Sequence, residues 1–152
     1  MINIRINNTK PESFSQSKSG TIWGPIYFET EQGAFPDKGW TDMVAAFLGP
    51  WIEALCQFAS GSTKQATVHF LDGPFSLKLG GAGSGIVEVS FVGDEKREPE
   101  KSTVRELLQN AVSAGDLVLA ICKERGWSTR DRDTESLIGG IERAKRLLAG
   151  VR

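Results

Sequence analysis

The chain contains few of the residues from which catalytic and metal sites are usually built. It has two cysteines and one histidine among 152 residues, and no group of cysteines and carboxylates has the spacing of a zinc site. There is no G-x-S-x-G nucleophile motif, and neither cysteine lies in a polar or helix-start context that would lower its pKa. We therefore expect no metal, no cofactor and no enzymatic activity.

The sequence also lacks a long apolar run and an excess of either charge. No stretch approaches the roughly 18 apolar residues that a membrane span needs, and the N-terminus has no apolar signal-peptide core. The net charge is −1, which argues against a nucleic-acid partner. Acidic residues outnumber basic ones by ten to six in residues 1–95, and basic residues outnumber acidic ones by twelve to nine in residues 96–152. We expect a cytoplasmic protein with a mildly acidic N-terminal part.

The two cysteines fall on apolar stripes of predicted helices. Cys56 and Cys122 are therefore interpreted as small buried hydrophobic residues. A disulfide between them is compatible with their number, but a reducing compartment disfavours it. We expect two free thiols.

The spacing of apolar residues predicts a single α+β domain with a small antiparallel sheet of about five strands. Residues 1–92 should form the sheet and a first, central helix, residues 93–101 a polar linker, and residues 102–152 a helical hairpin packed on the sheet. Pro25 cannot donate a ladder hydrogen bond, so its strand should lie at an edge or carry a bulge. Alternating apolar side chains mark five strands, at Ile2–Ile6, Thr21–Glu31, Val68–Phe70, Phe75–Leu79 and Val87–Phe91.

The first helix is predicted from an apolar stripe at three- and four-residue steps between residues 44 and 58. Thr41 can cap its N-terminus. Pro50 interrupts the stripe and removes a backbone hydrogen bond, so we expect a kink there or a division into two short helices.

Two further helices are predicted after the polar linker. Residues Thr103 to Glu106 match a capping box, and Gly126 can end the second helix in a left-handed conformation. The third helix runs from near Asp133 to a stop at Gly150. We expect its Gly139-Gly140 pair to pack closely against the second helix near Gly115.

One candidate site lies on the sheet face opposite the core. Pairing the core-facing residues, for example Leu77 with Val89, aligns His69, Lys78 and Glu88 in one row across three strands. An imidazole, an ammonium and a carboxylate in a row can perform acid–base chemistry or bind a charged group. Opposite charges on an open sheet face also stabilise the sheet by ~0.2–1 kcal/mol without any function. Both interpretations remain open at this stage.

A second candidate site is acidic. Glu29, Glu31, Asp37 and Asp42 surround Trp40 in the sequence, and together they suit a basic protein partner with Trp40 as an aromatic anchor. Alternatively, the same residues have purely structural roles. Asp37 then belongs to a turn, Asp42 interacts favourably with the helix dipole, and Trp40 is a core or staple residue.

The segments FPDKGWTD (residues 35–42), WIEAL (51–55) and FLDGPFSLKL (70–79) resemble small bacterial immunity proteins of polymorphic toxin and contact-dependent inhibition systems. The resemblance covers roughly residues 20–92. It implies an antiparallel sheet with helices packed on one side. It also implies that the protein neutralises a cognate toxin by direct binding, without chemistry of its own. For a nuclease toxin the expected complement is an acidic patch, because the active site of such a toxin is basic.

The expected partner is therefore a protein toxin, with no nucleic acid and no membrane involved, and the chain itself is expected to be a monomer or weak homodimer. Two alternatives remain. The His69, Lys78 and Glu88 face could serve a small-ligand-binding protein or an enzyme if a pocket covers it. The chain could also be a self-associating structural subunit, with the uneven surface charge or the Thr21–Glu31 edge strand as its contact.

Overall fold

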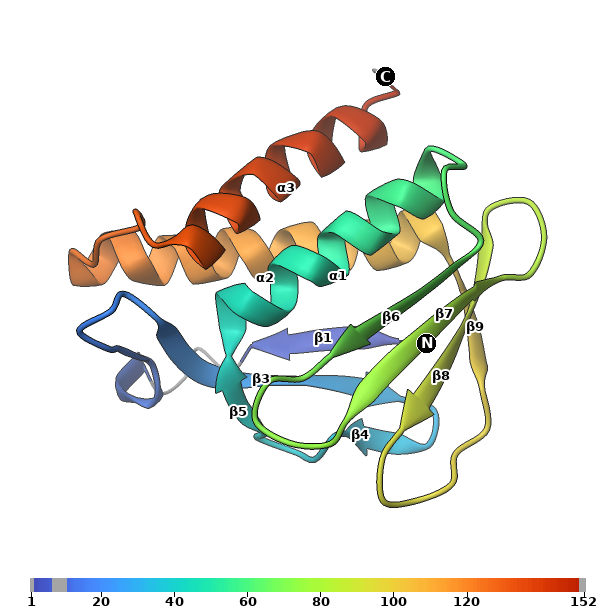
Figure 1. Cartoon of the computed structure of the whole chain (residues 1–152), viewed down its shortest axis with the longest axis horizontal. Coiled ribbons are helices and arrows are strands. Elements are labelled where there is room, and N and C mark those ends of the chain that lie inside the picture. Colours follow the sequence, from blue (N-terminus) through green and yellow to red (C-terminus); the bar gives the residue numbers. More distant parts are fainter. Residues whose placement is uncertain (1, 7–10, 151–152) are drawn as a thin grey trace.

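The computed structural model describes residues 2–6 and 11–150, and it shows three helices on one side of the molecule and the strands on the other (Figure 1). The strands form two antiparallel sheets. The α+β class is thus confirmed, but the single predicted sheet is two sheets, because β5 leads directly into α1 and the strands after α1 pair only with one another. In chain order the elements are β1 (Asn3–Ile6), the 3-10 helix η1 (Pro11–Ser13), β2 (Ser15–Gln16), β3 (Ile22–Thr30), β4 (Gly33–Phe35), β5 (Thr41–Met43), α1 (Val44–Ala59), β6 (Gln65–His69), β7 (Ser76–Gly81), β8 (Ile86–Val92), β9 (Glu100–Thr103), α2 (Val104–Arg125) and α3 (Arg132–Leu148).

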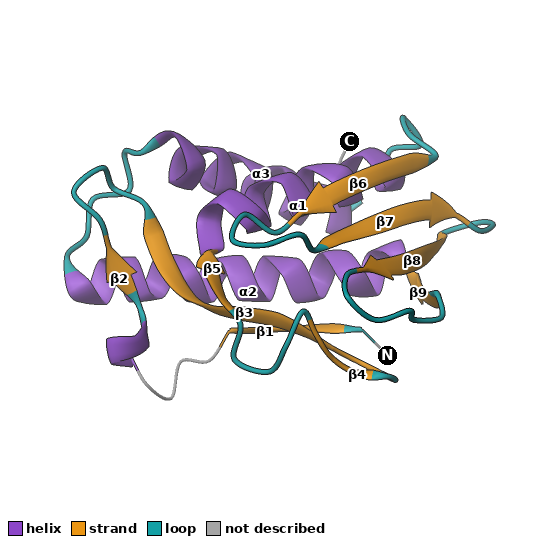
Figure 2. Cartoon of the chain, turned by 60° about the horizontal axis from the view of Figure 1, so that its bottom comes forward, coloured by secondary structure: helices purple, strands orange, loops and turns teal. Residues whose placement is uncertain are grey.

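The first sheet is built around β3, which pairs with β1, β2, β4 and β5 (Figure 2). Of the two alternatives predicted for this strand, an edge position or a bulge, the edge position is therefore wrong. Pro25 is paired with Thr41 of β5, and no other described strand pairs with it. A proline is tolerated at the centre of the sheet because β1 and β2 end on either side of this position, at Ile26 and Trp23.

The second sheet has the order β6-β7-β8-β9. Its apolar side chains share the core face as predicted, with Leu77 between Val68 and Phe91. The last strand, β9, pairs with β8 and includes residues 100 and 101, so the predicted polar linker is in part a strand.

Helix α1 packs against both sheets and against the other two helices. Its N-cap residue is Met43, which makes no side-chain capping bond, and Thr41 lies in β5, so the predicted Thr41 cap is wrong. The helix continues through Pro50 without a division into two. Pro50 is exposed whereas Gly49 and Trp51 are buried. The lost hydrogen bond therefore lies on the solvent side, while burial holds the two halves together.

An aromatic cluster joins α1 to both sheets. Phe28 of β3 lies edge-on to Trp51 of α1, with ring centroids 5.1 Å apart. Phe47 of α1 stacks on Phe70, at the end of β6, at 4.2 Å. The Phe35 ring of β4 also lies edge-on to the Phe70 ring, with centroids 6.1 Å apart. Each buried aromatic side chain stabilises the fold by roughly 1.5–3 kcal/mol, so this cluster is the main link between the two sheets.

The ends of α2 are those the sequence predicts. The Thr103 hydroxyl accepts a hydrogen bond from the Glu106 N–H at 3.0 Å, and Gly126 has the left-handed φ of 67°. The close contact of α2 with α3 at Gly115 is also confirmed, because a Cβ there would lie 2.7 Å from Ile141 Cδ1. The expectation for the glycine pair of α3 is wrong. Gly140 faces Ile52 of α1, and a Cβ on Gly139 would meet no atom within 4 Å.

Replacing Gly139 with alanine should therefore stabilise the protein by about 1 kcal/mol, the difference in helix propensity between the two residues. Gly115→Leu should destabilise it by roughly 1–3 kcal/mol, because the added atoms must displace buried Ile141. Urea unfolding of both variants measures the two effects. A Gly139→Ala variant less stable than the parent would show that this position has a packing role.

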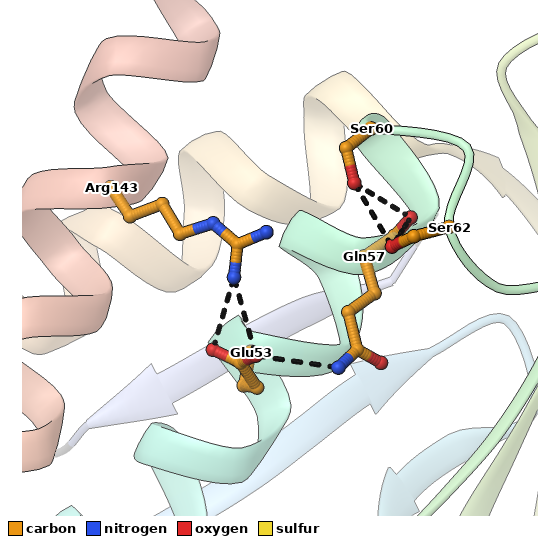
Figure 3. A network of polar contacts seen from close by, with 5 residues as sticks. All are labelled: Glu53, Gln57, Ser60, Ser62 and Arg143. Carbon is orange, nitrogen blue, oxygen red and sulfur yellow. Dashed lines mark hydrogen bonds and ion pairs between the residues drawn. The ribbon is translucent and has the colours of Figure 1, made fainter. Parts of the chain in front are cut away.

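Polar contacts on the surface join α1 to α3. Arg143 Nη1 lies 3.2 Å from Glu53 Oε1, and Gln57 donates to the same oxygen at 3.3 Å (Figure 3). Ser60 and Ser62 follow the last residue of α1, and the hydroxyls of both donate to the Gln57 carbonyl. Both charged side chains of the ion pair are about half exposed, so the pair contributes at most about 1 kcal/mol. We interpret this network as structural.

Candidate protein-binding groove

The predicted row of His69, Lys78 and Glu88 does not form. Lys78 lies opposite Ser90, while His69 is paired with Ser76. The β6–β7 register differs by two residues from the predicted one, because four residues, 71–74, connect Phe70 to Phe75 and the Phe70 N–H donates to the Phe75 carbonyl. The β7–β8 register also differs by two residues. A shift of two residues leaves every side chain on its predicted face. The shift between β7 and β8 moves Glu88 away from Lys78, to a position opposite Gly80 and Lys101.

The structure brings Asp37, Trp40 and Asp42 of the predicted acidic site together and places Glu29 and Glu31 in other contacts. Glu29 forms an exposed ion pair with Arg5 at 3.0 Å. The backbone N–H of Glu31 donates to the carboxylate of Glu100 at 3.1 Å. Asp42 is fully buried, so it cannot touch a partner. Only Asp37 and Trp40 line a common cavity.

That cavity is an open groove of about 420 Å³ between the segment that follows β4 and the loop that joins β8 to β9. We call it the Trp40 groove. Aromatic and carboxylate side chains make up most of its lining. Its residues are Ala34, Phe35, Pro36, Asp37, Trp40, Phe75, Gly93, Asp94, Glu95 and Arg97.

Trp40 is held in place by the buried carboxylate of Asp42. The indole Nε1 donates to Asp42 Oδ2 at 3.0 Å. The same oxygen accepts the N–H groups of Leu71 at 3.1 Å and Asp72 at 3.2 Å, and Oδ1 accepts the N–H of Met43 at 2.7 Å. One carboxylate of the first sheet thus fixes both the tryptophan and the β6–β7 turn of the second sheet, since a buried acceptor with four donors has little freedom to move.

The opposite wall of the groove is fixed by contacts between β4 and the β8–β9 loop. Arg97 donates to the carbonyl of Ala34 at 2.7 Å, and its guanidinium lies over the Phe35 ring, 5.2 Å from the centroid. Gln32 donates to the carbonyl of Glu98 at 2.7 Å and accepts from the Glu98 N–H at 2.8 Å. The groove is therefore formed where contacts join the two sheets.

Sequence reasoning missed the residues contributed by the β8–β9 loop. Asp94, Glu95 and Arg97 belong to the segment GDEKREPEK (residues 93–101), which was interpreted as a linker. Its dense charge was visible in the sequence, but its proximity to Trp40 depends on the pairing of strands from two sheets. No local pattern predicts that pairing.

The cysteines offer no second site. Cys56 and Cys122 are free and buried. Desolvation by burial is the largest cause that raises the pKa of both thiols above the ordinary value, and Asp131 raises that of Cys122 further. Since the thiolate is the nucleophilic form, neither thiol is suited to catalysis.

Within residues 2–6 and 11–150, no three His, Cys, Asp or Glu side chains gather closely enough to hold a metal ion. None of the described helices has the length and apolar character to cross a bilayer. Comparisons of the chain with protein-family models, curated proteins and solved structures found no match.

Proposed function

We propose that this chain is a non-enzymatic domain that binds another protein, and that its role is to neutralise a bacterial toxin directly. The observation that carries the binding proposal is the Trp40 groove, which combines Trp40 and Phe75 with three carboxylates. Tryptophan anchors beside a charged rim are typical of the small part of an interface that supplies most of the affinity. The toxin as partner is suggested by the resemblance of residues 20–92 to immunity proteins.

A basic partner fits this surface best. Asp37, Asp94 and Glu95 line the groove with Arg97 as the one described cation, so a cationic surface would be attracted over a distance of about one Debye length. An inhibitor of a nuclease-like toxin needs such a surface, because an active site that binds nucleic acid is itself basic.

The alternatives have less support. His69 and Lys78 are exposed and lie opposite serines, so the acid–base row on which an enzyme would depend is absent. The strand expected to mediate self-association, β3, pairs with four other strands and is not an edge of its sheet. A protein-binding role is the function that the geometry favours.

Reversing a groove charge should slow association with the partner. We expect Asp37→Lys to lower the association rate constant by about 3–10-fold and to weaken its dependence on salt, because rim charges act mainly through electrostatic steering. Glu142→Lys is the matched control, since this exposed residue lies on α3, on the helical side of the molecule (Figure 1). Surface plasmon resonance at two salt concentrations measures both. Equal association rate constants for the two variants would contradict the assignment of the groove as the contact surface.

A further inference from the structure

We propose that the Trp40 groove is a receptor site for one arginine side chain of a basic protein partner. This inference rests on the proposed binding function and goes further, by naming the chemical group that enters the groove and two residues, Asp94 and Glu95, that pair with it.

The charge of the groove is unbalanced. Asp94 and Glu95 make no hydrogen bond or ion pair with another described residue. The one hydrogen bond to the Asp37 side chain that the structure describes comes from the N–H of Lys38 at 2.8 Å. Arg97, the one cation in the lining, is engaged with backbone carbonyls and the Phe35 ring. Two carboxylates are thus available for an incoming cation.

The aromatic side chains select a guanidinium among cations. Trp40 and Phe75 lie edge to face with ring centroids 5.1 Å apart. A guanidinium is planar and weakly hydrated, so it stacks on an aromatic face and pairs with a carboxylate at the same time, which an ammonium does less well. The protein already stacks one guanidinium on an aromatic ring in the same groove, since Arg97 lies over Phe35 while its N–H groups donate to backbone carbonyls.

The site is preformed. Asp42 fixes the indole of Trp40, and a Cβ on Gly73 would lie 3.1 Å from the Trp40 ring. On the other side, a Cβ on Gly93 would lie 2.6 Å from Phe75. Both rings are therefore confined by neighbouring backbone, and a ligand does not have to order them on binding.

The test is a titration of the full chain with N-acetyl-arginine methylamide, followed by NMR of the Trp40 indole and the amides of Gly93 and Asp94. Trp40→Phe identifies the indole signal. We expect saturable shifts with a dissociation constant on the order of 1–10 mM, as suits a ligand of this size at an open site. The citrulline analogue, which has the same shape and no charge, should give no saturable shift. Asp94→Asn with Glu95→Gln should weaken arginine binding at least fivefold, and Glu142→Gln should leave it unchanged.

Equal shifts with arginine and citrulline, or none with arginine at 50 mM, would overturn the proposed arginine site. Such a result leaves the protein-binding function to be judged by capture of a partner. Conversely, a captured partner that binds the wild-type and Asp94→Asn/Glu95→Gln chains with equal affinity would also overturn the arginine site, while supporting protein binding by another surface.

Discussion

Replacing Asp42 with alanine will lower the free energy of unfolding by about 4 kcal/mol. The substitution removes the acceptor of four partly buried hydrogen bonds, whose donors are the indole Nε1 of Trp40 and the N–H groups of Met43, Leu71 and Asp72. An unsatisfied buried donor costs about 1–3 kcal/mol, and the access of water to these partly buried groups reduces their sum. This is a large fraction of the 5–15 kcal/mol that holds a typical domain together.

Urea unfolding, monitored by tryptophan fluorescence, measures this loss. The urea concentration at the midpoint should fall while the m-value stays unchanged. Asp42→Asn should lose about half as much, because the amide keeps one acceptor oxygen but turns a donor toward the remaining N–H groups. Asp72→Ala is the control, since its exposed side chain takes no part in the network. A loss below about 1 kcal/mol for Asp42→Ala would show that the carboxylate is not the link between Trp40 and the β6–β7 turn.

Replacing Trp40 with alanine will weaken partner binding by roughly 30-fold or more, which corresponds to about 2 kcal/mol, the level of an interface hot spot. The indole forms the aromatic wall of the groove and contacts Phe75. Trp40→Phe should keep part of the affinity, because a ring remains although its hydrogen bond to Asp42 is lost.

Trp127→Ala provides the matched control. Trp127 is also half-buried, but it follows α2 at the connection to α3 and lies beneath Arg125, away from the groove. Isothermal titration with the captured partner, after circular dichroism has verified folding, compares the three variants. Equal losses for Trp40→Ala and Trp127→Ala would contradict a specific role for the groove.

Local features of the fold could be predicted from the sequence. The capping box at Thr103, the stop at Gly126 and the alternation of Val87, Val89 and Phe91 each depend on neighbours within a few residues. The helices and most strands follow from these signals. The two-sheet arrangement could not be predicted in this way, because it depends on which strands pair across α1.

The candidate site was predicted only in part for the same reason. Trp40 and Asp37 were identified because their residue types are informative in themselves. Asp42 was predicted either to belong to an acidic partner-binding patch or to favour the helix dipole, whereas its carboxylate is buried and accepts four donors. The error in the His69 row came from two hairpin connections. The sequence Asp72-Gly73-Pro74 indicates a turn but does not determine how many residues it contains, and the same holds for the glycine-rich connection between β7 and β8.

The most direct test of the central claim is a comparative capture from lysate of the native host. Tagged wild-type chain and the Asp94→Lys/Glu95→Lys variant are incubated with lysate that expresses the neighbouring genes, and the retained proteins are identified by mass spectrometry. We predict that the wild type retains one basic protein in stoichiometric amount, that salt releases it, and that the variant fails to retain it. Recovery of the bait alone from both samples would contradict the proposal that this chain acts by binding a basic protein.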